Sequence, residues 1–477
     1  MAAVETKDRH VLVIAGAGSG KTTTIVGRIK YLLSNGVNPD SILCISFTNA
    51  SVRSLSDKIY EETSTHVDVY TFHKLSLNIL GTTSLIYKLS APDSLDYLVR
   101  EYLMHTIVNN LNELYDLIKY NNIFAFKIGL IYQYKKIDKA KIDSLCSLIS
   151  KFVRMMKTNG YGIDEFSKFY NQKLRTKKFY LLRLILRIYQ LYQYELSSSC
   201  EYDFDDIIIA ATDVVNNGAY DSKYKYIFVD EYQDTSMIRF KLVESLINCN
   251  NAFLFAVGDD FQSIYKFSGC NLGIMLDFGK MFLDASIYQI TNTYRFSQEL
   301  IDISSKFILK NKKQIKKSLK SNKHLDRPIR IIRYINYVND FKKIFSKINV
   351  KNSIVILGRY NKDIYKILDK DYTIDNDFNV IYKPLNIKMK YMTIHKSKGL
   401  EFEEVIIINL IDDIFGFPSK IADDPILRMV SPSVDSFPYS EERRLFYVAL
   451  TRTKGYVYLY VPYYGRSKFI RELKLRG

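Results

Sequence analysis

The sequence predicts an α/β fold with two parallel-sheet lobes and a helical insertion in the first lobe. Short apolar runs typical of β-strands alternate with helical patterns up to residue 80 and again between 200 and 291, and a second series begins near residue 329. This alternation is typical of parallel sheets covered by helices. Between about residues 81 and 200 the β pattern stops and apolar residues recur at helical spacing. The length of 477 residues also indicates about three compact units.

The predicted elements follow this division along the chain. After an opening strand at 11–15, the first lobe is expected to have strands at 41–48, 67–73, 225–231, 252–259 and 286–291. A long apolar helix at 178–196 belongs to the insertion. The second lobe is expected to have strands at 329–335, 353–360, 390–395, 404–411 and 456–462. We therefore assign residues 1–85 and 201–288 to the first lobe, 86–200 to the insertion and 289–477 to the second lobe.

The composition excludes several classes of protein. With 47% hydrophobic and 25% charged residues, the chain is neither disordered nor fibrous. No apolar run reaches the ~18–20 residues that cross a bilayer, and no signal peptide is visible, so we expect no membrane partner. The five cysteines are scattered and odd in number, which argues against a disulfide framework and a zinc site. We expect a location inside the cell, either the cytoplasm, the nucleoid or a viral factory.

The charge balance indicates a polyanionic partner. Lys and Arg number 68 against 51 acids, a formal charge of +17, and neutralising phosphates releases counterions. A lysine-rich genome bias would give the same excess. The run at 310–323 carries seven lysines and no acid. It could bind nucleic-acid phosphates, but a solvated helix face is the expected role.

A phosphate-binding loop lies between the first strand and the following helix. Its glycines let backbone N–H groups approach phosphates, and the helix N-terminus favours negative charge. Lys21 is expected to pair with the β- and γ-phosphates and Thr22 to hold Mg²⁺. Ala15 stands where the strict motif has glycine. The predicted nucleotide-binding residues here are Gly16, Ala17, Gly18, Ser19, Gly20, Lys21, Thr22 and Thr23.

Two acids at the end of a later predicted strand are candidates for binding the metal and activating water. The segment "YIFVDEYQD" places Asp230 and Glu231 after an apolar run, where a carboxylate can reach a bound metal. Asp230 suits Mg²⁺ coordination, and Glu231 suits orienting and deprotonating the attacking water. Together with the phosphate loop, these acids indicate a P-loop NTPase that uses a nucleoside triphosphate and Mg²⁺.

Ordered motifs over nearly the whole chain resemble the UvrD/Rep/PcrA group of superfamily 1A DNA helicases. Beside the phosphate loop and "VDEYQD", they are "SFTNASVRSLSDKI" (46–59), "VYTFHKL" (69–75), "DFDDII" (203–208), "VGDDFQSIYKFSG" (257–269), "TNTYRFS" (291–297), "ILGRYN" (356–361), "MTIHKSKGLEF" (392–402) and "EERRLFYVALTRTK" (441–454). The resemblance implies two RecA-like lobes, DNA-dependent ATP hydrolysis and 3′→5′ movement along DNA. Polarity cannot be read from the residues themselves.

The resemblance also assigns roles to single residues. Gln262 would contact the γ-phosphate, and Arg295 and Arg452 would be arginine fingers from the second lobe. Tyr294 would stack on adenine and Glu401 would touch the ribose. An arginine finger typically contributes about 10³–10⁵ in rate, so hydrolysis would be fast only when the lobes close.

A sequence-tolerant grip on DNA needs aromatic platforms, which give about 1–3 kcal/mol per base. By the resemblance, Phe47, Tyr265 and Phe267 would stack on bases. Phe267 stands where the family commonly has tryptophan, so we expect weaker stacking there. The remaining predicted DNA-binding residues, mostly at the backbone, are Thr48, Asn49, Thr71, His73, Arg359, Asn361, Thr393 and His395.

The chain departs from the family pattern in two places. No glutamine stands upstream of "AAV" (2–4), where the family reads the adenine edge, so we expect either an incomplete N-terminus or relaxed adenine selectivity. Only the 29 residues 362–390 and Tyr391 separate "ILGRYN" from "MTIHKSKGLEF". The large helical insertion called 2B is therefore expected to be absent or vestigial.

Two functions remain open from the sequence. The first is an ATP-dependent helicase or translocase on single-stranded DNA and single-strand/duplex junctions, acting in repair, replication or recombination. The second is a DNA-sensing NTPase subunit of a larger nuclease–helicase or anti-phage complex, with a protein partner replacing 2B. An unrelated P-loop kinase would explain neither the DNA-track motifs nor the arginine fingers.

Overall fold

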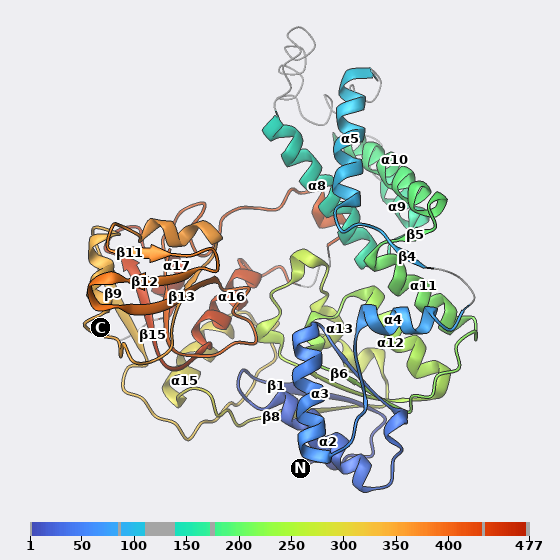
Figure 1. Ribbon diagram of the computed structural model, residues 1–477, viewed down its shortest axis with the longest axis horizontal. Coiled ribbons are helices and arrows are strands. Elements are labelled where there is room, and N and C mark those ends of the chain that lie inside the picture. The colour runs from blue at the N-terminus through green and yellow to red at the C-terminus, as the bar shows by residue number, and fades with distance from the viewer. Residues whose placement is uncertain (1, 84–86, 110–138, 172–176, 432–434, 474–477) are drawn as a thin grey trace.

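The computed structural model describes residues 2–83, 87–109, 139–171, 177–431 and 435–473 (Figure 1). Two sheets lie side by side, and a group of helices projects beyond the first sheet. The predicted two-lobe α/β class with a helical insertion is confirmed. In the part of the chain that the structure describes, no helix is both long enough and apolar enough to span a bilayer.

The first sheet is fully parallel, with strand order β3-β2-β6-β7-β1-β8. Alternate residues of its inner strand β1 face opposite layers, as the period of two requires. Leu12 and Ile14 pack in the layer of α4, α11 and α12, whereas Val11 and Val13 pack in the layer of α2 and α3. The strands are β1 (His10–Ala15), β2 (Ile42–Ser46), β3 (Asp68–Thr71), β6 (Tyr226–Val229), β7 (Phe253–Gly258) and β8 (Ala285–Ile290). The helices are α1 (Ala2–Glu5), α2 (Lys21–Ser34), α3 (Asn49–Thr63), α4 (Phe72–Leu80), α11 (Phe204–Asn216), α12 (Met237–Asn250), α13 (Leu272–Leu276) and α14 (Phe278–Met281).

The helical insertion has its own apolar core. Its described helices are α5 (Ser94–Asn109), α8 (Lys139–Thr158), α9 (Ile163–Asn171) and α10 (Lys177–Ser198). Two short strands, β4 (Lys88–Leu89) and β5 (Glu201–Tyr202), pair in parallel where the chain enters and leaves it. The long apolar helix expected at 178–196 is thus found within α10.

The second sheet has strand order β11-β12-β13-β10-β14-β15-β9. Five of its strands run parallel, as predicted, but β11 and β12 add an antiparallel edge that the sequence reading missed. These two short strands lie within the 362–390 segment, together with 3₁₀ turns. The strands are β9 (Ile329–Tyr334), β10 (Ile354–Gly358), β11 (Tyr372–Ile374), β12 (Asn379–Tyr382), β13 (Ile387–Thr393), β14 (Phe402–Ile407) and β15 (Thr453–Pro462). One face is covered by α15 (Gln298–Ile308), α16 (Ser440–Leu450) and α17 (Lys468–Leu473).

Candidate nucleotide site and nucleic-acid track

The phosphate-binding loop joins the carboxyl end of β1 to the N-terminus of α2. Gly18 and Gly20 have φ angles of +68° and +83°, a backbone region that favours glycine. A Cβ at Gly18 would also lie 2.5 Å from Cβ of Arg295, which comes from beyond the first sheet. Thr22 and Thr23 occupy the first turn of α2. The predicted strand–loop–helix context is therefore present, and the loop is packed against the second-lobe side of the cleft.

Lys21 and Glu231 form an ion pair across the site. Lys21 Nζ lies 2.8 Å from Oε1 of Glu231, which follows the carboxyl end of β6. Burial opposes ionisation of Glu231, but Lys21 and Lys398 outweigh it and lower its pKa to about 2. Burial and the neighbouring Glu231 raise the pKa of Asp230 to about 6. The two predicted acids are thus adjacent, but their pKa values are shifted in opposite directions.

The donor set fits a magnesium ion that is also held by nucleotide phosphates. The carboxylate of Asp230 is buried beside that of Glu231, and Lys21 pairs directly with Glu231. A hard divalent cation with oxygen ligands would balance this negative charge. Among the described residues, no group of three or more His, Cys, Asp or Glu could hold a metal by itself. A metal here would therefore need the phosphates and Thr22 as well as Asp230.

Gln262 lies where the two lobes meet. Its Nε2 donates to Oδ2 of Asp259 at 2.6 Å, and its Oε1 accepts from Arg452 at 3.1 Å. Arg452 begins the turn after α16 and is almost fully buried. Burial and the nearby Arg295 lower its pKa to about 9. The structure therefore brings the predicted phosphate sensor and one predicted arginine finger into direct contact.

The other predicted nucleotide residues surround the same loop. Arg295 Nε lies 3.1 Å from Oε2 of Glu401, and its NH1 donates to the carbonyl of Thr451 at 3.3 Å. The backbone N–H of Tyr294 donates to the carbonyl of Gly18 at 3.1 Å, and its side chain is 69% exposed. An exposed aromatic ring beside the phosphate loop is free to stack on a base. These positions agree with the expected roles, which stay predictions.

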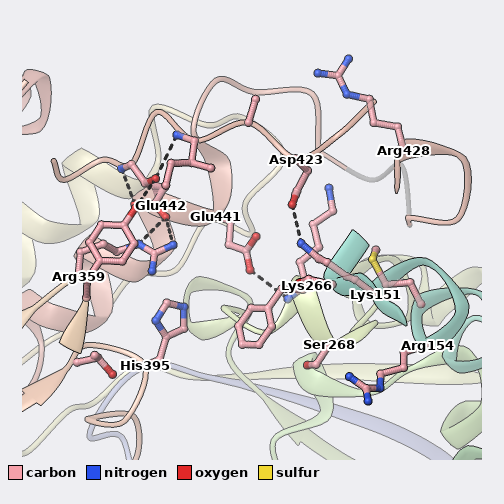
Figure 2. A pocket seen from close by; sticks show the side chains of 18 of the residues that line it. Lys151, Arg154, Lys266, Ser268, Arg359, His395, Asp423, Arg428, Glu441 and Glu442 are labelled. Atoms are coloured by element: carbon pink, nitrogen blue, oxygen red, sulfur yellow. Dashed lines mark hydrogen bonds and ion pairs between the residues drawn. The ribbon is translucent and has the colours of Figure 1, made fainter. Parts of the chain in front are cut away.

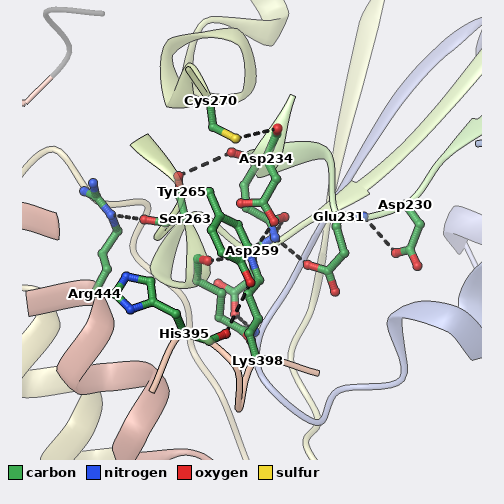
Figure 3. A network of polar contacts seen from close by, with 12 residues as sticks. Asp230, Glu231, Asp234, Asp259, Ser263, Tyr265, Cys270, His395, Lys398 and Arg444 are labelled. Atoms are coloured by element: carbon green, nitrogen blue, oxygen red, sulfur yellow. Dashed lines mark hydrogen bonds and ion pairs between the residues drawn. The ribbon is translucent and has the colours of Figure 1, made fainter. Parts of the chain in front are cut away.

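A polar network connects the acids after β6 to the second lobe (Figure 3). Lys398 Nζ pairs with Asp234 and donates to the carbonyl of Gln262 at 2.8 Å. Its ammonium also lies 4.8 Å from the ring centre of Tyr265. Arg444, on α16, donates from Nε to the carbonyl of Ser263 at 2.6 Å. Contacts from the second lobe thus converge on the segment 259–267.

The lysine-rich run contradicts the expectation of a solvated helix face. Residues 310–323 contain no helix, and Lys317 is buried between the two lobes. Its Nζ pairs with Asp259 and lies 2.5 Å from Oδ1 of Asp260 and 3.7 Å from the ring centre of Phe261. Leu319, two residues later, packs against Gly16 of the phosphate loop. A pattern of repeated lysines does not reveal that one of them faces buried carboxylates from a distant segment.

A large cavity lies between the insertion and both lobes (Figure 2). Its volume is about 1670 Å³. At its floor the rings of Phe267 and His395 lie 5.6 Å apart, and Tyr265 contacts both. Burial and nearby cations lower the pKa of His395 to about 4, so its ring is neutral at pH 7. The predicted DNA-binding residues that line the cavity are Phe267, Arg359, Asn361, Thr393 and His395.

The members of the predicted DNA track that follow β2 and β3 form a separate group at the carboxyl ends of these two strands. These strands are neighbours, with Ser46 opposite Thr71. Phe47 is part-buried against Phe72, with rings 5.5 Å apart. None of this group lines the cavity. Thr48 and Thr71 cap α3 and α4, Asn49 begins α3, and His73 packs edge-on against Phe204.

Several residues at the cleft were missed by the sequence reading. Lys398 stood inside the quoted motif "MTIHKSKGLEF", and that motif was the signal that could have found it. Lys151 and Arg154 line the cavity from α8, outside every motif. No local pattern marks those two, because they come to the cavity only through the packing of the insertion.

Comparison with known proteins now decides the family. The N-terminal domain of UvrD/REP helicases matches residues 1–283, and the UvrD-like helicase C-terminal domain matches residues 373–464. The chain belongs to the UvrD/Rep family of ATP-dependent DNA helicases.

Three relatives illustrate the extent of the match. DNA helicase IV of Escherichia coli is 28% identical over 99% of this chain and 69% of its own length. A probable DNA helicase of Mycoplasma pneumoniae is 26% identical over 97% of this chain and 84% of its own length. The ATP-dependent DNA helicase PcrA of Leuconostoc citreum is 29% identical over 66% of this chain but 39% of its own length. The chain therefore aligns with less than half of the PcrA-type relative.

Proposed function

We propose that this chain hydrolyses ATP between its two lobes and uses the energy to move 3′→5′ along single-stranded DNA. The observation that carries the proposal is the short segment 259–267. Gln262, at its nucleotide end, contacts Arg452, and Phe267, five residues later, lies in the cavity. A shift at the nucleotide can therefore reach an aromatic platform through a few backbone bonds. We propose that residues 1–85 and 201–288 form the first lobe and that residues 289–477 form the second.

The chemistry follows from the ion pair at the phosphate loop. In the structure Lys21 neutralises Glu231. The β- and γ-phosphates of ATP compete for Lys21, which would leave the Glu231 carboxylate free to orient and deprotonate water. Mg²⁺ held by Asp230 and Thr22 would neutralise charge on the phosphates when bound. The Lys21–Glu231 pair and nucleotide binding would thus compete for the same ammonium group.

Closure of the lobes would complete the site. Arg452 and Arg295 come from the second lobe and lie beside Gln262 and Gly18 of the first. A nucleotide that engages both sides stabilises the closed arrangement, and loss of the γ-phosphate removes that stabilisation. Alternation between the two states would advance the strand past the aromatic platforms of the cavity. Inside the cell, such a motor would serve DNA repair, replication or recombination.

Unwinding is proposed to depend on a protein partner. Residues 362–390, where the family places a helical insertion, form short 3₁₀ turns and the strands β11 and β12. This edge offers no helical subdomain to contact duplex DNA. The observation also favours the second candidate, an NTPase subunit of a nuclease-containing or anti-phage assembly. Strong unwinding of a tailed duplex by the isolated chain would contradict the dependence on a partner.

The ATPase rate with and without single-stranded DNA tests the proposal. We expect DNA to stimulate turnover, Lys21→Ala to abolish it, and Glu231→Gln to bind ATP without hydrolysing it. Glu62→Gln is a matched control, because it removes an acid from an exposed ion pair with Lys30. Normal hydrolysis by Glu231→Gln would show that Glu231 is not the general base.

A further inference from the structure

A segment of the second lobe crosses the cavity and docks on the helical insertion of the first. We name residues 419–430 the strap. It follows β14 and precedes α16, so the chain on both sides of it belongs to the second lobe. Its C-terminal part contains a short 3₁₀ turn, η8 (Leu427–Met429), which lies beside α8 in Figure 1.

The docked end is held by apolar burial. Ile426, Leu427 and Val430 are each at most 3% exposed and belong to the same core cluster as residues of α5, α8 and α10. Three large apolar side chains from one lobe are therefore removed from water by another part of the molecule. This burial of apolar side chains distinguishes the strap from a loop that lies exposed on the protein surface.

Polar contacts fix the same end in register. Lys151 Nζ lies 2.6 Å from Oδ1 of Asp423, a pair that Figure 2 shows at the edge of the cavity. Lys178 donates to the carbonyl of Pro425 at 3.3 Å, and Asn159 donates to the carbonyl of Val430 at 3.1 Å. Three separate side chains of the insertion thus hold the strap.

The cavity beneath the strap has the size and the aromatic lining for an extended strand. Its volume of about 1670 Å³ exceeds the ~300–1,000 Å³ of ordinary small-molecule sites. The residues that line it include Phe267 and His395, Arg359 and Arg154, and Lys420 of the strap, and its acidic side chains equal its basic ones in number. Aromatic rings together with cations are the combination that binds single strands without sequence preference.

We propose that the docked strap closes a channel around one strand of nucleic acid. Four parts of the protein form a closed ring around the cavity. The first lobe is continuous with the insertion, and the insertion holds the strap. The strap is continuous with the second lobe, and the second lobe contacts the first. A strand on the cavity floor is therefore surrounded on every side. It enters either by threading a free end or by undocking of the strap. This inference rests on the proposed function, because it concerns the same DNA track.

Cross-linking the strap to the insertion tests the enclosure. Lys151→Cys and Asp423→Cys place two thiols across the docking contact, and Cys200→Ser with Cys249→Ser removes the exposed native thiols. A short bis-maleimide is added after the full-length chain has bound circular or linear single-stranded DNA of the same sequence. The controls are the two variants that carry only one of the introduced cysteines, because neither can form the intended bridge. Any cross-link in these controls would reveal a reaction through a native thiol such as Cys146.

On circular DNA, we expect the cross-linked fraction to stay bound in high salt and to be released when the circle is cut. On linear DNA, high salt should release it, because the electrostatic grip weakens and the chain slides off an end. When the cross-link is made first, binding to circles should be lost while binding to linear strands is kept. Equal release of the cross-linked chain from circles and linear strands would overturn the enclosure.

Binding of the uncross-linked chain at low salt separates this inference from the proposed function. Normal low-salt binding to both DNAs, followed by salt release from cross-linked circles, would overturn the enclosure alone. Failure to bind either DNA at low salt would overturn the proposed function and the enclosure with it.

Discussion

Arg452 of the second lobe donates a hydrogen bond to Oε1 of Gln262 in the first lobe, over 3.1 Å. The same guanidinium is buried and also donates to the carbonyls of Val448 and Leu400, at 3.0 and 3.2 Å. These hydrogen bonds fix the position of the Arg452 guanidinium. Preorganised charge of this kind costs little to align during the reaction.

Arg452→Lys is expected to lower kcat strongly and to change nucleotide binding much less. Lysine keeps the charge but cannot form the same fork of hydrogen bonds to Val448 and Gln262. The reduction should approach the ~10³–10⁵ that an arginine finger contributes. Single-turnover hydrolysis and equilibrium binding of a fluorescent ATP analogue measure the two effects. A variant with unchanged kcat would show that Arg452 only supports the interface.

Lys317→Met should lower both stability and turnover. The change leaves Asp259 and Asp260 buried without their cation, and breaking a buried ion pair costs about 3–5 kcal/mol. Asp259 also holds the amide of Gln262, so the phosphate sensor loses its support. Thermal unfolding and kcat measure the two losses.

Lys317→Met with Asp260→Asn is the charge-matched control for that prediction. The double variant keeps the net charge of the buried cluster and should recover much of the thermal stability. Its kcat should stay low, because the link from residue 317 to Asp259 is still missing. Full recovery of kcat would assign Lys317 a purely structural role.

Phe267→Trp should tighten binding to single-stranded DNA, and Phe267→Ala should weaken it. The side chain is 50% exposed at the cavity floor, so a larger ring can gain contact with a base. Loss of one stacking platform costs about 1–3 kcal/mol, roughly 5- to 150-fold in Kd. Fluorescence anisotropy with an oligonucleotide measures it, and Tyr464→Ala, at an 81% exposed tyrosine, is the control. Equal affinities for all three residues at 267 would exclude stacking there.

His73 and His395 should make the fold less stable in mild acid. Burial, helped by nearby cations, lowers the pKa of both to about 4, whereas an unfolded histidine titrates near 6.5. Between about pH 6.5 and 4 the unfolded chain binds more protons, so these residues make stability fall as the pH falls. Buried Asp206, with its pKa raised to about 6, acts in the opposite sense.

The contribution of the two histidines is obtained by difference. Urea unfolding from pH 7 to pH 4.5 should show a smaller acid-induced loss for the variant His73→Gln with His395→Gln than for the natural chain. Because Asp206 is present in both chains, its effect cancels. Identical pH profiles would contradict the depressed pKa values.

Much of the fold could be predicted because most of its strands can be recognised from their own residues. Each buried strand is a short apolar run between turns, and the ordered motifs identify the cleft. The strands β11 and β12 were missed because they have only three and four residues and are flanked by Lys, Asp and Asn. Lys317 was misread because its burial depends on Asp259 and Asp260, more than fifty residues away in sequence. Docking of the strap likewise depends on a contact between Leu427 and the insertion.

The most direct test of the central claim is displacement of streptavidin from biotinylated single-stranded oligonucleotides. A motor that moves 3′→5′ should, with ATP, displace streptavidin from a 5′ biotin faster than from a 3′ biotin, and Glu231→Gln should displace it from neither. Equal, ATP-independent displacement from both ends, together with an ATPase rate that DNA does not change, would contradict the account.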